Sequence, residues 1–248
     1  SSFISDHCLL TEPANSFPEL KQVAHSLDCC ICGSDQVWSP NCFDENYFLP
    51  FVEDPQRRIS YAPSFGASYI TDPEIERRTK SLLSDFGPLS VRETTGAKIV
   101  EKLIGRTPDV VVDPTLLLDL EGWGQLLGSK TSVDKGYILC YFLGDPERYE
   151  QSALACSKAL GLPLVSIPTV AGQKHSVGYE VGPEEYLRLF MGASYVLTDS
   201  FHGTAFSVNF GVPFSVFKRF SDKDPRSQNS RITSFLQLMG LEDRLVPS

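Results

Sequence analysis

The sequence predicts an α/β protein made of two Rossmann-like domains with parallel sheets that face each other across a cleft. Short apolar runs alternate with amphipathic helical patterns along the 248 residues, which is typical of parallel strand–helix–strand units. Most of the apolar runs end at a polar or glycine-containing turn. A less regular stretch at 119–135 separates two series of this kind, so we expect it to join the two domains.

The first series is expected to form a domain at 1–125. Asp72 and Pro73 are the usual cap and first residue of a helix, and Gly33 closes the first apolar run. The expected elements, in order, are strands at 27–32 and 58–62, a helix from about 73 to 86, a strand at 89–91, a helix at 95–104 and a strand at 109–112.

The second series is expected to form a domain at 126–226. The expected elements, in order, are a strand at 137–142, a helix at 147–160, a strand at 164–167, a helix at 183–191, a strand at 195–198, a helix from about 202 to 210 and a strand at 214–217. A final amphipathic helix at 231–239 lies in a C-terminal segment, 227–248, which we expect to pack back on the first domain.

The composition excludes several classes of protein. A hydrophobic content of 42% with 21% charged residues is ordinary for a globular chain and excludes a disordered one. The net charge of −9 argues against binding of duplex nucleic acid, which needs a basic face, so no nucleic-acid partner is expected. No apolar run approaches the ~18–20 residues needed to span a bilayer.

The seven cysteines indicate a reducing compartment. Cys29, Cys30 and Cys32 lie in an apolar run, where free thiols pack as small hydrophobic groups. The alternative is a metal site with Cys30 and Cys32 on one strand face and Cys42 or Cys8 as further ligands, but this spacing fits no zinc template. We therefore expect structural thiols, no metal and a cytoplasmic protein.

The turn at 199–204, between an expected strand and an expected helix, carries the clearest functional signal. Ser200 can cap the helix, and Gly203 permits close approach of a ligand to the backbone. His202 lies in the first helical turn, beside the N–H groups and the positive end of the helix dipole. The pattern predicts an anion site with a proton-transfer group. The alternative is that Ser200 and Thr204 only cap the helix and that His202 bonds to a neighbouring loop.

Ligands of parallel sheets bind beyond the carboxyl ends of the strands, so the other strand ends are candidates as well. Arg92 directly follows a strand and suits bidentate recognition of carboxylate or phosphate; the alternative is a surface or interdomain salt bridge. Trp38 is either a sugar platform or a core residue, and Lys218 adds a cation after the last strand. Small and hydrogen-bonding residues that line the cleft or form plain turns are Gly33, Ser34, Asp35, Gln36, Ser64 and Asp199.

Five segments together resemble the polysaccharide pyruvyl transferase family. They occur in the family's order and are 31–38 (ICGSDQVW), 59–66 (ISYAPSFG), 89–93 (LSVRE), 113–117 (DPTLL) and 196–204 (VLTDSFHGT). The resemblance implies a glycosyltransferase-B-like fold and transfer of the enolpyruvyl group of phosphoenolpyruvate to two sugar hydroxyls, which gives a pyruvate ketal and phosphate. It implies no cofactor, a glycan or lipid-linked oligosaccharide as acceptor, and peripheral membrane association.

The same resemblance implies roles for individual residues. Arg92 and His202 fall on positions that hold the donor in family members. The expected catalytic residues are His202 as general acid or base, Arg92, and Asp35, with Asp35 or Asp199 stabilising a cationic intermediate or taking a hydroxyl proton. The expected donor or phosphate contacts are Arg92, Ser200, Phe201, His202, Gly203, Thr204 and Lys218.

Two departures from the family pattern matter. Family members carry arginine where this chain has Ser200, so we expect either that Lys218, Arg219 or Arg231 replaces it or that the donor differs. Members also have a further strand–turn–helix unit upstream, so the first domain is expected to be truncated. A nucleotide-sugar glycosyltransferase of the same fold and a catalytically silent glycan-assembly module stay open as alternatives.

Overall fold

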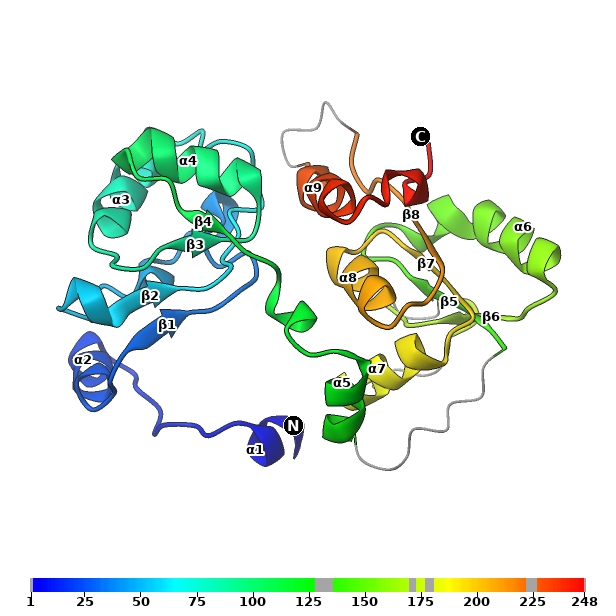
Figure 1. The fold of residues 1–248 in the computed structure, drawn as a ribbon, viewed down its shortest axis with the longest axis horizontal. Helices are drawn as coiled ribbons and strands as arrows, with labels where there is room; N and C mark the ends of the chain where they lie inside the picture. Colours follow the sequence, from blue (N-terminus) through cyan, green and yellow to red (C-terminus); the bar gives the residue numbers. More distant parts are fainter. Residues whose placement is uncertain (1, 128–135, 170–172, 177–180, 222–226, 248) are drawn as a thin grey trace. The chain divides into compact units, whose positions relative to one another are not determined.

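The computed structural model describes residues 2–127, 136–169, 173–176, 181–221 and 227–247. The chain forms two compact α/β units (Figure 1): an N-terminal unit, Leu9–Pro114, and a C-terminal unit, Ser1–Cys8 with Thr115–Ser248. Every strand pair among the described residues is parallel. The prediction of an α/β chain with parallel sheets is therefore confirmed.

The N-terminal unit contains two pairs of short strands. β1 pairs with β2, and β3 pairs with β4. Its strands are β1 Cys30–Cys32, β2 Arg58–Ser60, β3 Ser90–Val91 and β4 Asp109–Val110. Its helices are α2 Phe17–His25, α3 Pro73–Ser84 and α4 Thr94–Ile104, with short 3-10 helices η1 Pro40–Cys42, η2 Glu45–Phe48 and η3 Pro55–Arg57.

Two buried serines join β2 to β3. Ser60 Oγ donates to the Ser90 carbonyl at 2.8 Å, and Ser90 Oγ donates to the Ser60 carbonyl at 2.7 Å. The Ser90 N–H donates in turn to Ser60 Oγ at 2.9 Å. These side chains supply hydrogen bonds that a backbone ladder would otherwise make. The four strands consequently lie in the order β1-β2-β3-β4, and their carboxyl ends share one edge.

The C-terminal unit contains one sheet with the strand order β6-β5-β7-β8. Its strands are β5 Ile138–Tyr141, β6 Leu164–Ser166, β7 Tyr195–Thr198 and β8 Phe214–Val216. Its helices are α1 Ser2–His7, α5 Leu120–Leu127, α6 Glu150–Leu160, α7 Pro183–Gly192, α8 Phe201–Asn209 and α9 Asn229–Met239, with η4 Pro114–Leu116, η5 Pro146–Tyr149 and η6 Glu242–Arg244. The chain steps outward from β5 to β6 and then crosses back to β7, so the switch point lies between β5 and β7.

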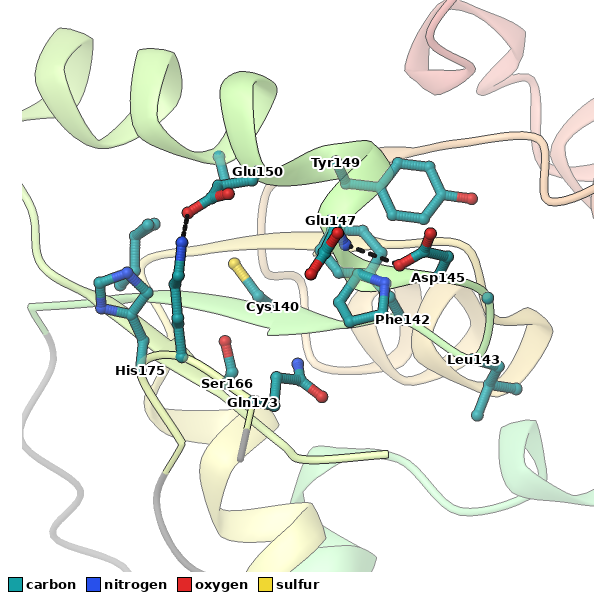
Figure 2. Close-up of a pocket in the computed structure, with 15 residues that line it drawn as sticks. Cys140, Phe142, Leu143, Asp145, Glu147, Tyr149, Glu150, Ser166, Gln173 and His175 are labelled. Atoms are coloured by element: carbon teal, nitrogen blue, oxygen red, sulfur yellow. Dashed lines mark hydrogen bonds and ion pairs between the residues drawn. The ribbon is translucent and has the colours of Figure 1, made fainter. Parts of the chain in front are cut away.

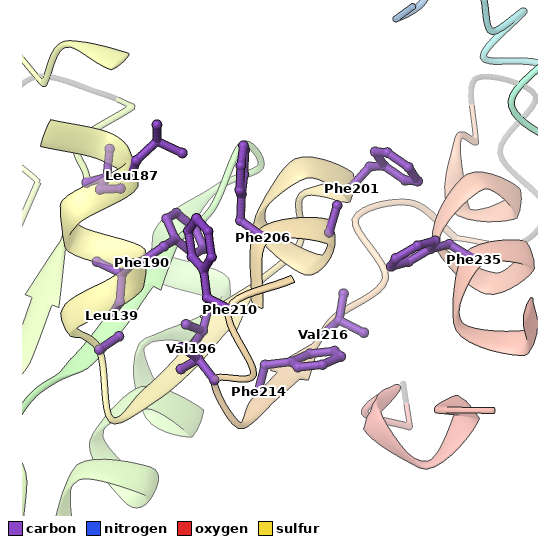
Figure 3. Packing of buried hydrophobic residues seen from close by; sticks show 14 of the residues in the cluster. Leu139, Leu187, Phe190, Val196, Phe201, Phe206, Phe210, Phe214, Val216 and Phe235 are labelled. Atoms are coloured by element: carbon purple, nitrogen blue, oxygen red, sulfur yellow. The ribbon is translucent and has the colours of Figure 1, made fainter. Parts of the chain in front are cut away.

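The two faces of this sheet bury different helices. Leu139 and Val196 face the cluster formed by α7, α8 and α9, whereas Ile138 and Cys140 face α6. Figure 3 shows the aromatic rings of the first cluster, where Phe206 lies 5.5 Å from Phe210 between ring centroids. The alternation along β5 is what a strand covered on both faces requires.

Most expected elements are confirmed with small changes at their ends, and three helices, α1, α2 and α5, were not expected. α5 lies where the sequence indicated an irregular passage. The glycines in this stretch led us to expect no helix. Asp119 stabilises the start of α5 by accepting a bond from the Gly122 N–H at 2.9 Å. Trp123 packs on Phe206, with 5.5 Å between the ring centroids. α2 was not expected, although Ser16 caps it by accepting from the Glu19 N–H. The rest of that passage, 128–135, lies outside the described residues.

The units divide between Pro114 and Thr115, whereas the sequence placed the boundary at 125/126. The final helix, α9, packs on α8 within the C-terminal unit, where Phe235 meets Phe201 at 5.5 Å. No helix among the described residues is both long and apolar enough to cross a bilayer. All seven cysteine thiols are free.

Candidate functional site

The β7–α8 turn is a capped helix start, as its sequence predicted. Ser200 Oγ accepts a bond from the Gly203 N–H at 3.3 Å, and Thr204 Oγ1 donates to the Ser200 carbonyl at 2.9 Å. Residue 203 must be glycine, because a Cβ there would lie 2.4 Å from Thr198 Oγ1. The last residue of β7 thus fixes how closely the helix approaches the strand end.

Only part of this turn is accessible. The side chains of Ser200, Phe201 and Thr204 are buried, whereas His202 is half-buried, as is Lys218 after β8. The predicted donor contacts from the three buried side chains are therefore replaced by capping and packing. Of the donor contacts predicted at this end, His202 and Lys218 are the side chains that stay partly exposed.

Asp199 anchors the loop that follows β5. Its carboxylate, 0% exposed, accepts bonds from the backbone N–H groups of Leu143 at 2.7 Å and Gly144 at 2.9 Å. The Tyr149 hydroxyl donates to the same carboxylate at 3.2 Å, and Arg219 Nε lies 3.5 Å from it. Both oxygens are committed to neighbouring groups, so Asp199 is placed to position the switch point rather than to line a cavity or take a hydroxyl proton.

Glycine is required at position 144 for the same reason. A Cβ on Gly144 would lie 2.8 Å from Asp199 Oδ2 and 3.1 Å from the Arg219 side chain. Burial, together with the charge of Asp199, raises the pKa of Tyr149 to about 12, so its hydroxyl remains a donor to the carboxylate. The ends of β5 and β7 are consequently held as one rigid edge.

Two of the cations expected to compensate for Ser200 lie close to this edge. Arg219 Nη2 donates to the Asp199 carbonyl at 3.2 Å, so Arg219 is bound to the anchor. Arg231, only 7% exposed, lies over the Phe201 ring at 5.9 Å and donates to Gln228 Oε1 at 2.6 Å. A buried guanidinium thus lies against the first residue of α8.

In the N-terminal unit, Arg92 gathers carboxylates from three strand ends. Arg92 is 7% exposed, and its Nη1 lies 2.5 Å from Asp113 Oδ2 and 3.3 Å from Ser34 Oγ. Its Nη2 lies 3.6 Å from Asp35 Oδ1, and its Nε lies 3.8 Å from Glu93 Oε2. The structure therefore brings Arg92, Ser34 and Asp35 together, and it adds Asp113 and Glu93, which lie in two of the segments that resemble the family but were not predicted as site residues.

The charges of this Arg92 cluster disfavour a highly charged anion. One guanidinium faces three carboxylates, of which Asp113 and Glu93 are buried. Separating a buried ion pair typically costs ~3–5 kcal/mol. A phosphate or carboxylate would have to displace these partners, whereas sugar hydroxyls could donate to the acids without displacing the arginine.

The remaining candidates of the N-terminal unit differ in accessibility. Ser64 is buried and donates to Glu93 Oε1 at 2.7 Å. The Gln36 side chain lies over Gly66, where a Cβ would meet Gln36 Oε1 at 2.4 Å. Gly33 is exposed, and a Cβ there would meet nothing within 4 Å. Ser64 and Gln36 thus pack at the carboxyl-terminal edge of the strands, whereas the surface at Gly33 stays exposed to solvent.

Trp38 does not line a cleft. It is 1% exposed, stacks on Phe48 with ring centroids 5.2 Å apart, and donates from Nε1 to the Tyr47 carbonyl at 3.2 Å. Its ring is enclosed by aromatic neighbours and cannot offer a face to a sugar. The interpretation as a sugar platform is therefore corrected to a core residue.

One pocket was missed by the sequence reasoning. It lies in the C-terminal unit at the carboxyl ends of β5 and β6, encloses about 600 Å³, and is drawn in Figure 2. Cys140, Tyr149 and Ser166 contribute to its walls, together with Leu143 and Gly144 from the loop held by Asp199. No sequence motif marked it; its lining residues lie within 140–153, 164–166 and 173–175. Among the described residues, no three His, Cys, Asp or Glu side chains are grouped so as to hold a metal ion.

Comparisons with known proteins agree with the motifs. A family model described as polysaccharide pyruvyl transferase matches residues 3–219. A structure of UDP-GlcNAc 2-epimerase from Neisseria meningitidis bound to UDP-GlcNAc is similar, with a TM-score of 0.54, 14% identity and coverage of 95% of this chain and 78% of that one. No curated protein matches significantly.

A second structure, UDP-GlcNAc 2-epimerase from Methanocaldococcus jannaschii in complex with UDP-GlcNAc and UDP, has a TM-score of 0.50 and 14% identity over 98% of this chain and 81% of that one. At this identity the likeness concerns the fold alone. It confirms the predicted Rossmann-like architecture of the glycosyltransferase-B type.

Proposed function

Because the chain belongs to the polysaccharide pyruvyl transferase family, we propose that it transfers the enolpyruvyl group of phosphoenolpyruvate to a pair of hydroxyls on a glycan. The product is a pyruvate ketal, and phosphate is released. The family match over residues 3–219 carries this proposal. The capped start of α8 supports it, because a helix N-terminus with nearby cations suits an anionic donor.

The donor is proposed to bind at the α8 end of the C-terminal unit. Arg231 places positive charge at this helix start, and Arg219 offsets Asp199. Lys218 follows Phe217, whose N–H donates to the carbonyl of Thr198 at the end of β7. Phosphoenolpyruvate carries both a phosphate and a carboxylate, so it gains from several cations and from the helix dipole. The Arg92 cluster, with its three acids, is better suited to hydroxyls of an acceptor than to this donor.

The transfer balances without any co-reactant. A proton adds to the methylene carbon of phosphoenolpyruvate and leaves an oxocarbenium-like carbon, which one sugar hydroxyl attacks as it loses its proton. The bond between this carbon and the bridging oxygen of the phosphate then breaks, and phosphate leaves with the bonding electrons. The second hydroxyl attacks the same carbon and loses its proton. Of the two hydroxyl protons, one balances the new methyl group and the other balances the released hydrogen phosphate.

His202 is proposed to carry the proton in this reaction. It is the half-buried titratable side chain in the first turn of α8, where the donor is proposed to bind. An imidazole can give a proton to carbon and accept one from a hydroxyl near neutral pH. Arg231 and Lys218 are proposed to hold the donor anion and so to supply the charge that arginine supplies in other family members.

The test is a transfer assay with phosphoenolpyruvate and a panel of glycans. Phosphate release and the mass of the glycan product are followed for the wild-type chain, for His202→Ala and for the control His25→Ala, whose imidazole is exposed on α2. We expect loss of at least ~10²-fold in the rate for His202→Ala, the usual contribution of general acid–base catalysis, and no change for the control. Wild-type turnover by His202→Ala would contradict the assignment of His202.

A nucleotide sugar is the alternative donor that this experiment must separate. The similar epimerase structures hold UDP-GlcNAc. A ligand that binds the folded protein raises the midpoint temperature of its unfolding. This midpoint is therefore measured in the presence of phosphoenolpyruvate, of UDP-GlcNAc and of UDP. Stabilisation by UDP-GlcNAc alone would favour a glycosyltransferase. No stabilisation and no product would favour a silent glycan-assembly module.

A further inference from the structure

The pocket at the carboxyl ends of β5 and β6 adjoins the proposed donor end without being part of it. Leu143 and Gly144 form one of its walls, and their backbone N–H groups are bound by Asp199, which directly precedes the cap of α8. The pocket therefore lies on one side of the loop after β5, and the turn that leads into α8 is tied to the same loop. A ligand in the pocket would lie beside the reacting end of the unit.

The floor of the pocket is apolar and uncharged. Cys140 and Phe142 are buried against Ala153 of α6, and the rings of Phe142 and Tyr149 stack 4.4 Å apart. Burial raises the pKa of the Cys140 thiol to about 12, so it is protonated at neutral pH. The Tyr149 hydroxyl is already bonded to Asp199. The floor thus offers apolar contact and no charge to a ligand.

The rim is acidic. Asp145, Glu147 and Glu150 lie around the opening. Among the described lining residues, Lys174 is the one lysine or arginine, and the imidazole of His175 lies next to it in the chain. Lys174 Nζ donates to Glu150 Oε1 at 2.5 Å. Figure 2 labels Glu150 and marks an interaction at its carboxylate with a dashed line. The summed charge of the three carboxylates and Lys174 is −2. A phosphate, a carboxylate or a nucleotide would be repelled here.

A neutral sugar meets both requirements of this pocket. The carbon–hydrogen face of a pyranose packs on an apolar floor, and its hydroxyls donate to carboxylates such as Glu147 and Glu150. A volume of about 600 Å³ lies within the range of small-molecule sites. Anionic donors are excluded by the rim, so the pocket and the α8 end differ in the charge that they accept.

We propose that this pocket is a subsite for a neutral sugar of the acceptor glycan, one that precedes or follows the sugar that receives pyruvate. This assignment rests on the proposed function, since it presumes a glycan acceptor. The pocket would hold the chain of sugars beside the α8 end and so select acceptors longer than one residue. It would contribute to acceptor binding and not to the chemical step.

The binding test uses the full chain with lactose, cellotriose and maltotriose, followed by titration calorimetry and by amide hydrogen exchange of the segment 140–150. UDP and glucuronic acid serve as anionic probes. We expect at least one neutral saccharide to bind and to slow exchange in that segment, whereas the anionic probes do not. Protection of 140–150 by UDP, or by no saccharide of the panel, would overturn the proposal.

Two variants test whether the sugar binds in this pocket. Ala153→Phe fills the floor, and Glu147→Gln with Glu150→Gln keeps the shape of the rim but removes its charge. We expect each to weaken saccharide binding by roughly tenfold or more, as the loss of packing space or of hydrogen bonds to charged groups requires. Glu121→Gln, on the exposed face of α5, is the matched control and should bind normally. The rim variant alters only the surface, so it decides the matter even if Ala153→Phe fails to fold.

The outcome is separable from that of the proposed function. Binding is measured without phosphoenolpyruvate and without turnover. In the transfer assay, the rim variant should raise KM for oligosaccharides and leave KM for monosaccharides and kcat unchanged. Saccharide protection of 140–150 without pyruvate transfer would refute the proposed function alone. Pyruvate transfer by a chain that shows no such protection would refute the subsite alone.

Discussion

Replacing Asp199 by Asn tests the anchor between β5 and β7. The carboxylate accepts two backbone N–H groups at 2.7 and 2.9 Å and the Tyr149 hydroxyl at 3.2 Å, with Arg219 at 3.5 Å. An amide keeps one oxygen and turns an NH2 group toward a second donor. One charge-assisted bond is lost, the other two become neutral, and Arg219 loses its ion pair. Hydrogen bonds to charged groups contribute ~1.5–3 kcal/mol each. We therefore expect the free energy of unfolding of the C-terminal unit to fall by about 3 kcal/mol.

The two tryptophans allow this loss to be located. Trp38 lies in the N-terminal unit and Trp123 in the C-terminal unit, and the chain has no other tryptophan. Urea unfolding is followed by fluorescence in a Trp38→Phe background, where Trp123 reports on its own unit, and in a Trp123→Phe background for the other. With a urea slope of roughly 2 kcal/mol per molar, the Trp123 transition should move down by roughly 1.5 M, and the Trp38 transition should stay.

The matched control is Asp145→Asn. Asp145 is an exposed carboxylate that caps η5 by accepting from the Glu147 N–H at 3.0 Å, and asparagine caps about as well. It should leave both transitions in place. A change of less than about 0.5 kcal/mol in the Trp123 transition of Asp199→Asn, the range of ordinary surface substitutions, would refute the anchor.

Three further predictions concern single positions. Gly203→Ala should destabilise the C-terminal unit by about 1–3 kcal/mol, because its Cβ would lie 2.4 Å from Thr198 Oγ1; an unchanged Trp123-reported transition would contradict this. Arg231→Lys should raise KM for phosphoenolpyruvate and leave KM for the acceptor unchanged, because lysine loses the planar, stacked guanidinium; equal effects on both would argue for a purely structural arginine. Burial raises the pKa of the Cys32 and Cys140 thiols to about 12, so above pH ~9 the unfolded chain loses protons that the folded chain keeps, and stability should fall as pH rises from about 9 toward 12. The double alanine variant should show a shallower fall in thermal midpoint over that range, and an identical fall would exclude these thiols as its cause.

Local signals predicted the α8 turn well. The cap at Ser200 and the glycine at 203 act within one helical turn, so the sequence around them contains the information needed. Arg92 was also placed correctly after a strand, whereas its contact with Asp35 was not predicted. Its charge balance was not predictable, since Asp113 comes from another strand end and its contact depends on how β3 and β4 pair.

The rest of the candidate site depends on contacts between distant residues. Asp199 bonds to backbone groups more than fifty positions earlier in the chain. Gly144 is the one sequence signal for this contact, and the residue type at 143 does not indicate it. The sequence around Trp38 does not show whether the ring is buried or exposed. Its burial depends on stacking with Phe48, which lies ten positions later in the chain. The domain boundaries, the residue roles and the donor stay predictions.

The serine pair between β2 and β3 has a consequence for how this chain can change in evolution. Ser60 Oγ donates to the Ser90 carbonyl and accepts from the Ser90 N–H, whereas Ser90 Oγ donates to the Ser60 carbonyl and accepts from the Ala62 N–H. Loss of either hydroxyl therefore leaves buried polar groups of the backbone without a partner. A single replacement at Ser60 or Ser90 therefore passes through a weakened protein, whereas a paired replacement does not. Ser60 and Ser90, thirty residues apart in the sequence, are therefore expected to be replaced together in evolution. This pair couples the sequence of β2 to that of β3.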